Sequence, residues 1–80
     1  MEPGTLFRVK PYKDGLDRVS LGSLLDDHQL GESEQEVPLD SIGVVIEHHE
    51  KESNNFVDAF IVLIDGRQGW LWRDEMEVIL

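Results

Sequence analysis

The apolar residues of this chain are concentrated in its last third, in a nearly unbroken run from Phe56 to Ile64. A strand with one solvated face alternates apolar and polar side chains, whereas residues 60–64 are all apolar. We therefore predict a strand that is covered on both faces. Asp65-Gly66 is typical of a two-residue hairpin turn, and a second strand is expected from Gln68 to Trp72.

The same apolar strand supplies the candidate interface. A chain of 80 residues buries only about 60% of its unfolded surface, so oligomerisation would help it to fold. The second cover of the strand is then either another copy of the protein or the segment from Leu16 to Leu30. The candidate interface residues are Phe60, Ile61, Val62, Leu63 and Ile64.

The first half of the chain predicts one strand and a long connection. The strand runs from Thr5 to Lys10 and is ended by Pro11. Residues 11–40 are expected to form a long loop. Within it, Ser23 to Gln29 is a candidate helical turn with Ser23 as its cap, and Glu32 to Glu36 is an acidic stretch with little structure.

Three further elements complete the expected fold. Ile42 to His48 forms a strand in which Gly43 allows a sharp bend, and Glu47 to Asn55 is a charged connection. After the hairpin, Arg73 to Met76 suits one 3₁₀ turn, and Glu77 to Leu80 is a closing strand. The order of elements predicts a single all-β domain over residues 1–80. We expect a small five-stranded barrel of the SH3-like or Sm-like kind, with a long first loop and one short helical turn before the last strand.

The pattern also resembles a known group of proteins. The residues that carry this resemblance are Gly43-Val44-Val45-Ile46-Glu47, Ile61-Val62-Leu63-Ile64-Asp65-Gly66, Trp70-Leu71-Trp72-Arg73 and Glu77-Val78-Ile79. They are similar to the short barrel proteins encoded by marine phages of the cyanophage type. The resemblance implies an SH3-like or Sm-like barrel with a tendency to assemble, for example as a ring. The residues by which Sm proteins bind uridine-rich RNA are not visible, so no RNA-binding residue is implied.

Net charge weakens the case for a nucleic-acid partner. Seventeen acidic and seven basic residues give a formal charge of −10, which repels phosphate backbones, and the basic residues are scattered. An Sm-like RNA-binding ring is therefore the second choice. The acidic run Glu32 to Glu36 is interpreted as a solvated loop rather than as a site that recruits a basic partner.

Two clusters resemble chemical sites. His48-His49-Glu50 offers imidazole and carboxylate groups, the usual ligands of divalent transition metals. Adjacent strand residues point to opposite faces, so both imidazoles cannot hold one ion on a regular strand. Asp26-Asp27-His28 places a carboxylate beside an imidazole without an evident nucleophile. We therefore expect no metal, no cofactor and no catalytic residue.

The aromatic strand supplies the candidate ligand face. Trp70 and Trp72 share one face of their strand, and Arg73 follows them. Such a pair stacks a nucleic-acid base or a proline-rich peptide in some proteins, whereas a role in the core or in an interface is commoner. We keep Trp70, Trp72 and Arg73 as a candidate face for a ligand or partner.

The sequence lacks the glycine loops and nucleophile motifs of common enzymes. It predicts a non-enzymatic module that forms a homo-oligomer and binds another protein; the resemblance implies that the module is phage-encoded, with a phage or host protein as that partner. Cysteine is absent, no apolar run approaches the roughly 20 residues that span a bilayer, and Met1-Glu2-Pro3-Gly4 does not resemble a signal peptide. These features predict an intracellular protein with no membrane partner; with the resemblance to phage proteins, the expected place is the cytoplasm of an infected host cell, with the virion as the alternative.

Overall fold

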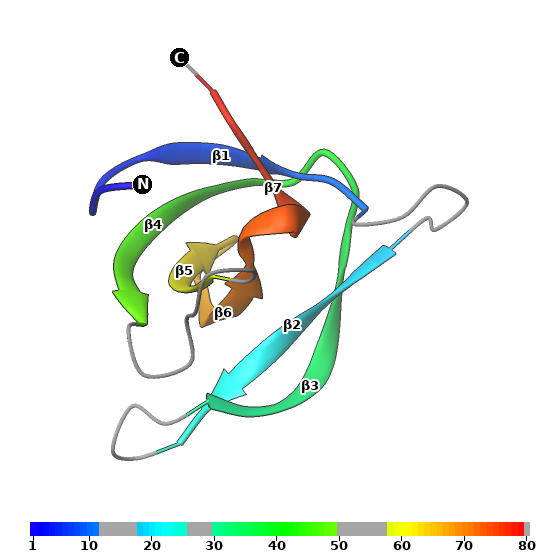
Figure 1. The fold of residues 1–80 in the computed structure, drawn as a ribbon. Coiled ribbons are helices and arrows are strands. Elements are labelled where there is room, and N and C mark those ends of the chain that lie inside the picture. The colour runs from blue at the N-terminus through cyan, green and yellow to red at the C-terminus, as the bar shows by residue number, and fades with distance from the viewer. Residues whose placement is uncertain (12–17, 26–29, 50–57, 80) are drawn as a thin grey trace.

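The fold is an antiparallel sheet that curls around one apolar core (Figure 1). The computed structural model describes residues 1–11, 18–25, 30–49 and 58–79. These residues contain strands and one 3₁₀ turn but no α-helix, which confirms the all-β class. The elements are β1 (Leu6–Val9), β2 (Arg18–Leu24), β3 (Leu30–Pro38), β4 (Ile42–His49), β5 (Ala59–Ile64), β6 (Arg67–Trp72), the 3₁₀ turn η2 (Arg73–Glu75) and β7 (Met76–Val78).

The order of strands is β3-β2-β6-β5-β4-β1-β7. Figure 1 shows β5 and β6 between the side formed by β1 and β4 and the β2–β3 hairpin. The turn between β3 and β4 brings the chain back to β1, because the backbone N–H of Val9 donates to the carbonyl oxygen of Ser41 at 2.8 Å and that of Asp40 donates to Val9 at 2.9 Å. The core thus collects side chains from both ends of the sheet, among them Phe7, Val19, Val37 and Leu71.

The prediction of a closed barrel with five strands is wrong. The described residues form seven strands in one sheet, and β3 and β7 are the edges of that sheet rather than partners of each other. The additional strands are β2 and β3, which lie in the segment 11–40 that was expected to be a long loop.

Alternation explains the β2–β3 hairpin. Val19 and Leu21 are buried while Arg18 and Ser20 are exposed, as in a strand with one solvated face. The acidic residues of β3 resemble those of a loop. They are compatible with a strand, because carboxylates are acceptable on the solvated side of an edge strand. The helical turn expected over residues 23–29 is also wrong where it is described: Ser23 and Leu24 belong to β2, and the hydroxyl of Ser23 donates to the carbonyl oxygen of Glu32 at 3.0 Å.

The apolar hairpin is confirmed. β5 and β6 pair from Ala59 opposite Trp72 to Ile64 opposite Arg67. Asp65 and Gly66 have φ of 51° and 76°, and two positive values in succession are what a type I′ turn requires. The closing strand and the 3₁₀ turn before it are confirmed as β7 and η2.

Two glycines make room for side chains of neighbouring strands. A Cβ at Gly43 would lie 2.6 Å from the ring of Phe7, so the glycine of β4 admits that ring to the core. A Cβ at Gly22 would lie 2.0 Å from Nε1 of Trp70. Gly22 and Trp70 form the single register pair between β2 and β6, so this glycine allows the two halves of the sheet to meet.

A buried carboxyl shapes the last turn. Glu75 is 8% exposed, and its Oε1 accepts the backbone N–H of Trp72 at 3.0 Å. Burial raises the pKa of Glu75, while the hydrogen bond from Trp72 opposes this and the nearby charge of Asp74 adds to it. The backbone N–H of Lys10 donates to the carbonyl oxygen of Glu75 at 3.0 Å, which joins the turn to the end of β1.

Candidate functional site

The outer face of the sheet carries an exposed row of apolar side chains. Leu6, Val44 and Leu63 are register partners on β1, β4 and β5, and partners in a sheet point to the same face. Leu6 is 51% exposed, Leu63 is 38% exposed, and Ile42, two residues before Val44, is 50% exposed. We call Leu6, Ile42, Val44 and Leu63 the apolar band. Ile46 lies at the register shift between Val45 and Glu47 and is 37% exposed.

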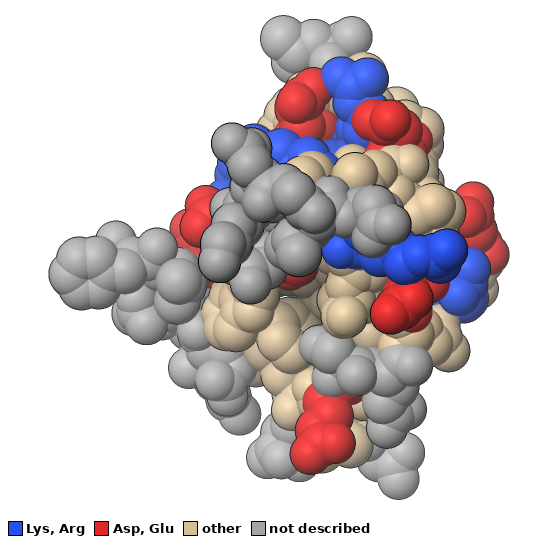
Figure 2. Space-filling model, turned by 90° about the vertical axis from the view of Figure 1, so that its right-hand side faces the viewer, with Lys and Arg blue, Asp and Glu red and all other residues tan. Residues whose placement is uncertain are grey.

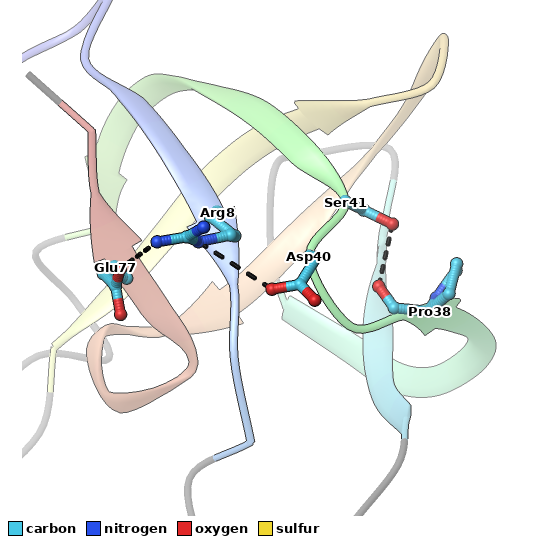
Figure 3. A network of polar contacts seen from close by, with 5 residues as sticks. All are labelled: Arg8, Pro38, Asp40, Ser41 and Glu77. Atoms are coloured by element: carbon cyan, nitrogen blue, oxygen red, sulfur yellow. Dashed lines mark hydrogen bonds and ion pairs between the residues drawn. The ribbon is translucent and has the colours of Figure 1, made fainter.

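An ionic group borders one end of the band. Arg8 is the register partner of both Ile42 and Glu77, so its guanidinium lies on the same outer face. The guanidinium donates a hydrogen bond to the Glu77 carboxylate, and its Nε lies 3.8 Å from Oδ1 of Asp40 (Figure 3). The hydrogen bond to Arg8 lowers the pKa of Glu77, and the same bond raises the pKa of Arg8. The hydroxyl of Ser41 donates to the carbonyl oxygen of Pro38 at 2.8 Å in the adjacent turn (Figure 3).

Glu47 and the two tryptophans border the other end. Ile61 is the partner of Glu47 on β4 and of Trp70 on β6, and Ala59 is the partner of Trp72. The two indoles meet edge to face with centroids 5.0 Å apart. Nε1 of Trp70 donates to the carbonyl oxygen of Gly31 at 3.0 Å, so this indole links β6 to β3. Trp70 therefore has a structural role, and Trp72 is partly exposed beside it.

The five candidate interface residues divide between the interior and the surface. Phe60, Val62 and Ile64 belong to the main core, and Ile61 is 1% exposed on the opposite face. Both faces of β5 are therefore covered within one chain, as the apolar run predicted, and no second copy is needed for this. Leu63 is the exception, because its side chain lies in the exposed band.

Arg73, the third residue of the candidate ligand face, is hydrogen-bonded to the backbone of Met76. Its guanidinium donates to the carbonyl oxygen of Met76 at 2.7 Å, and its carbonyl oxygen accepts the N–H of Met76. The carbonyl oxygen of Glu75 accepts the backbone N–H of Lys10, and the backbone N–H of Ile79 donates to Leu6. Because the backbone groups of successive strand residues point to alternate sides, those of Met76 point to the open edge of β7. Arg73 thus satisfies the backbone N–H and carbonyl group of Met76 on the open edge of β7. Pro38, which has no N–H, lies at the end of the other edge strand, β3.

The histidines do not meet at one site. His48 is the partner of the core residue Phe60 and its Nε2 lies 3.2 Å from Asp58, whereas His49 is the partner of Ala59. They point to opposite faces, as strand geometry predicted. No group of three or more metal-ligating side chains occurs within the described residues. Glu50 and the predicted cluster Asp26-Asp27-His28 lie outside the described residues.

Charges of both signs are mixed on the surface. Figure 2 shows basic and acidic side chains next to each other on the face in view, rather than a basic stripe. Of the acidic run, Glu32 and Glu36 are exposed on β3, and Glu36 lies 3.7 Å from Arg18. A cavity of about 280 Å³ opens beside this hairpin and is lined by Leu21, Ser23, Leu24, Gln35 and Gln68.

Leu6, Ile42 and Val44 are site residues that the sequence pattern did not lead us to predict. Leu6 and Arg8 alternate with the buried residues Phe7 and Val9, so the pattern of β1 contained the signal for an apolar side chain on the outer face. In comparisons with known proteins, no family model, no curated protein and no solved structure matches this chain. Among the described residues there is no helix of the length and apolar character needed to cross a membrane.

Proposed function

We propose that this protein is a non-enzymatic interaction and assembly module whose binding surface is the apolar band. The observation that supports this is the register of Leu6, Val44 and Leu63, which places three apolar side chains in one row on a solvated sheet face. Scattered apolar residues are normal on a surface, whereas a contiguous set with a polar rim is typical of a contact site. The sequence favours self-association as the form of assembly, and the binding of another protein is the second role of the same surface.

The sheet edges are less suited to this role. Pairing of open edges between copies would build a ring, as expected for an Sm-like protein. β7 has three residues, and Arg73 occupies the carbonyl group of Met76 on its open side. Charges and proline on β3 are the devices by which edge strands avoid pairing. Packing of outer faces is therefore the better route to an oligomer.

The origin and the place of action belong to the same proposal. The resemblance to short proteins of marine phages supports a role in the cytoplasm of an infected host cell, with a phage or host protein as a further partner. The alternative of an Sm-like RNA ring would need basic and aromatic side chains on one face. Its supports are weaker, because Arg73 is turned to Met76 and Arg8 is paired with Glu77 and Asp40.

Two aspartate substitutions on β5 test the proposal. Leu63→Asp is expected to leave the fold intact and to reduce the oligomer to a monomer, because the new carboxylate lies on the exposed band. Ile61→Asp is expected to destabilise the monomer by about 3–5 kcal/mol, because it buries an unpaired charge at a position that is 1% exposed. Size-exclusion chromatography with light scattering gives the mass, and urea denaturation gives the free energy of unfolding.

Gln68→Asp is the matched control, since Gln68 is the partner of Leu63 on β6 and is already polar. A wild-type protein that is monomeric at every concentration, and binds no other protein through Leu63, would refute the proposal. So would an oligomeric wild type whose Leu63→Asp variant keeps the same mass.

A further inference from the structure

The apolar band is flanked by two carboxylates that have no partner in the described part of the chain. Glu47 is exposed on β4 beside Ile61, which precedes Leu63 by two residues. Asp65 is exposed in the hairpin turn, two residues after Leu63. Neither side chain forms an ion pair or hydrogen bond with the described residues.

The positive charges near the band are already paired or lie elsewhere. Arg8 is held by Glu77 and Asp40, and Arg67 is the partner of the buried Ile64 and donates to Oε1 of Gln35 at 3.5 Å. Lys10, which follows β1, lies close enough to Glu77 to lower the pKa of that carboxyl further. The unpaired charges next to Leu63 are therefore negative, in a chain with a formal net charge of −10.

From this arrangement we infer that the band binds an extended, cationic segment of another protein, in which basic residues stand two positions before and after an apolar residue. The inference rests on the proposed function and names the partner of the same surface. A second copy of the chain fits less well, because it would bring a further −10 of charge to an acidic rim.

The spacing of the segment follows from strand geometry. Glu47 lies opposite Ile61, two residues before Leu63 on β5, which corresponds to about 6.6 Å at about 3.3 Å per residue, and Asp65 follows Leu63 by two residues as the first residue of the hairpin turn. In an extended segment, side chains on one face also recur every two residues. An apolar side chain placed on Leu63 and Val44 then brings a basic side chain to each carboxylate.

The probe is an acetylated and amidated peptide with the central residues Lys-Thr-Val-Thr-Lys. Its binding is followed by two-dimensional NMR of the labelled protein at low salt. Two control peptides have the central residues Glu-Thr-Val-Thr-Glu and Lys-Lys-Val-Thr-Thr, the second with the same composition in another order. We expect saturable binding of the first peptide with shifts at Val44 and Leu63, binding at least about fivefold weaker for the reordered peptide, and none for the acidic one.

The double variant Glu47→Gln/Asp65→Asn removes both carboxylates, and asparagine tolerates the positive φ of residue 65. We expect it to weaken binding of the lysine peptide about tenfold, as the loss of two charge contacts would, and to reduce its salt dependence. Glu32→Gln/Asp74→Asn removes the same number of exposed charges away from the band and is expected to change binding less than twofold.

Three results would overturn the inference: equal binding of the lysine and glutamate peptides, equal effects of the two double variants, or absence of saturable binding. A wild-type protein that dimerises through Leu63 without binding the lysine peptide would identify the second copy as the occupant. That outcome would leave the proposed function standing, whereas a Leu63→Asp variant that changes neither association nor peptide binding would refute both.

Discussion

Substitution of Gly22 by alanine tests how the two halves of the sheet are joined. The new Cβ would lie 2.0 Å from Nε1 and 2.2 Å from Cε2 of Trp70, far inside van der Waals contact. The indole would have to move, and its hydrogen bond to the carbonyl oxygen of Gly31 would be lost. The only register pair between β2 and β6 lies at the same position.

The expected cost has two parts. A lost hydrogen bond contributes about 1 kcal/mol. An extra methyl group in a packed site costs about 1–3 kcal/mol. Together they predict a loss of about 2–4 kcal/mol in the free energy of unfolding, a large share of the roughly 4–12 kcal/mol expected for a domain of this size.

Urea denaturation measures the free energy of unfolding, and far-ultraviolet circular dichroism reports the coupling between Trp70 and Trp72, which depends on their edge-to-face contact. Gly22→Ala should reduce both the free energy of unfolding and the coupling signal. In a Trp70→Ala background the same glycine substitution should cost less than 1 kcal/mol, because the side chain it collides with is absent. The reasoning would be refuted if the Gly22→Ala variant kept the coupling signal of the wild type and lost less than about 0.5 kcal/mol in the free energy of unfolding.

Three further substitutions test other contacts. The raised pKa of Glu75 means that its carboxylate form is disfavoured in the folded state, so the stability contributed by its protonated form is lost as the pH rises from the usual value of 4.5 through the folded pKa. Glu75→Gln should therefore gain stability relative to the wild type between pH 4 and pH 7 in urea titrations, and a relative loss would contradict this sign. Glu77→Gln should instead lose stability relative to the wild type at neutral pH, because the lowered pKa of Glu77 contributes stability that is present at neutral pH and is lost as the pH falls through the folded pKa. The effect is small because the pair with Arg8 is exposed. Equal pH profiles of stability for variant and wild type would contradict this prediction. Arg73→Ala should free the carbonyl group of Met76 and increase association through the β7 edge, measured by light scattering in the Leu63→Asp background, while Arg73→Lys restores part of the protection; an unchanged mass would show that Arg73 stabilises the turn alone.

Much of the second half of the chain could be predicted because its signals are local. Asp65-Gly66 favours two successive positive φ values, and the five apolar residues 60–64 require cover on both faces. The first half carried weaker signals. The acidic residues of β3 resemble those of a loop, and the pairing that makes them a strand is formed with β2 and not within β3 itself.

The sequence by itself determined the all-β class, the hairpin of β5 and β6, the closing strand with its 3₁₀ turn, and the opposite directions of His48 and His49. These depend on residues that are close in the chain. Only the tertiary structure decided which apolar side chains remain exposed, because burial depends on the strands that lie alongside. Leu63 and Ile61 have the same chemistry and lie on the same face, yet one is exposed and the other is covered. Likewise, the sequence shows the charges of Arg8 and Arg73 but not their partners. Those partners follow from a sheet in which β1 lies between β4 and β7 and β7 is an edge strand.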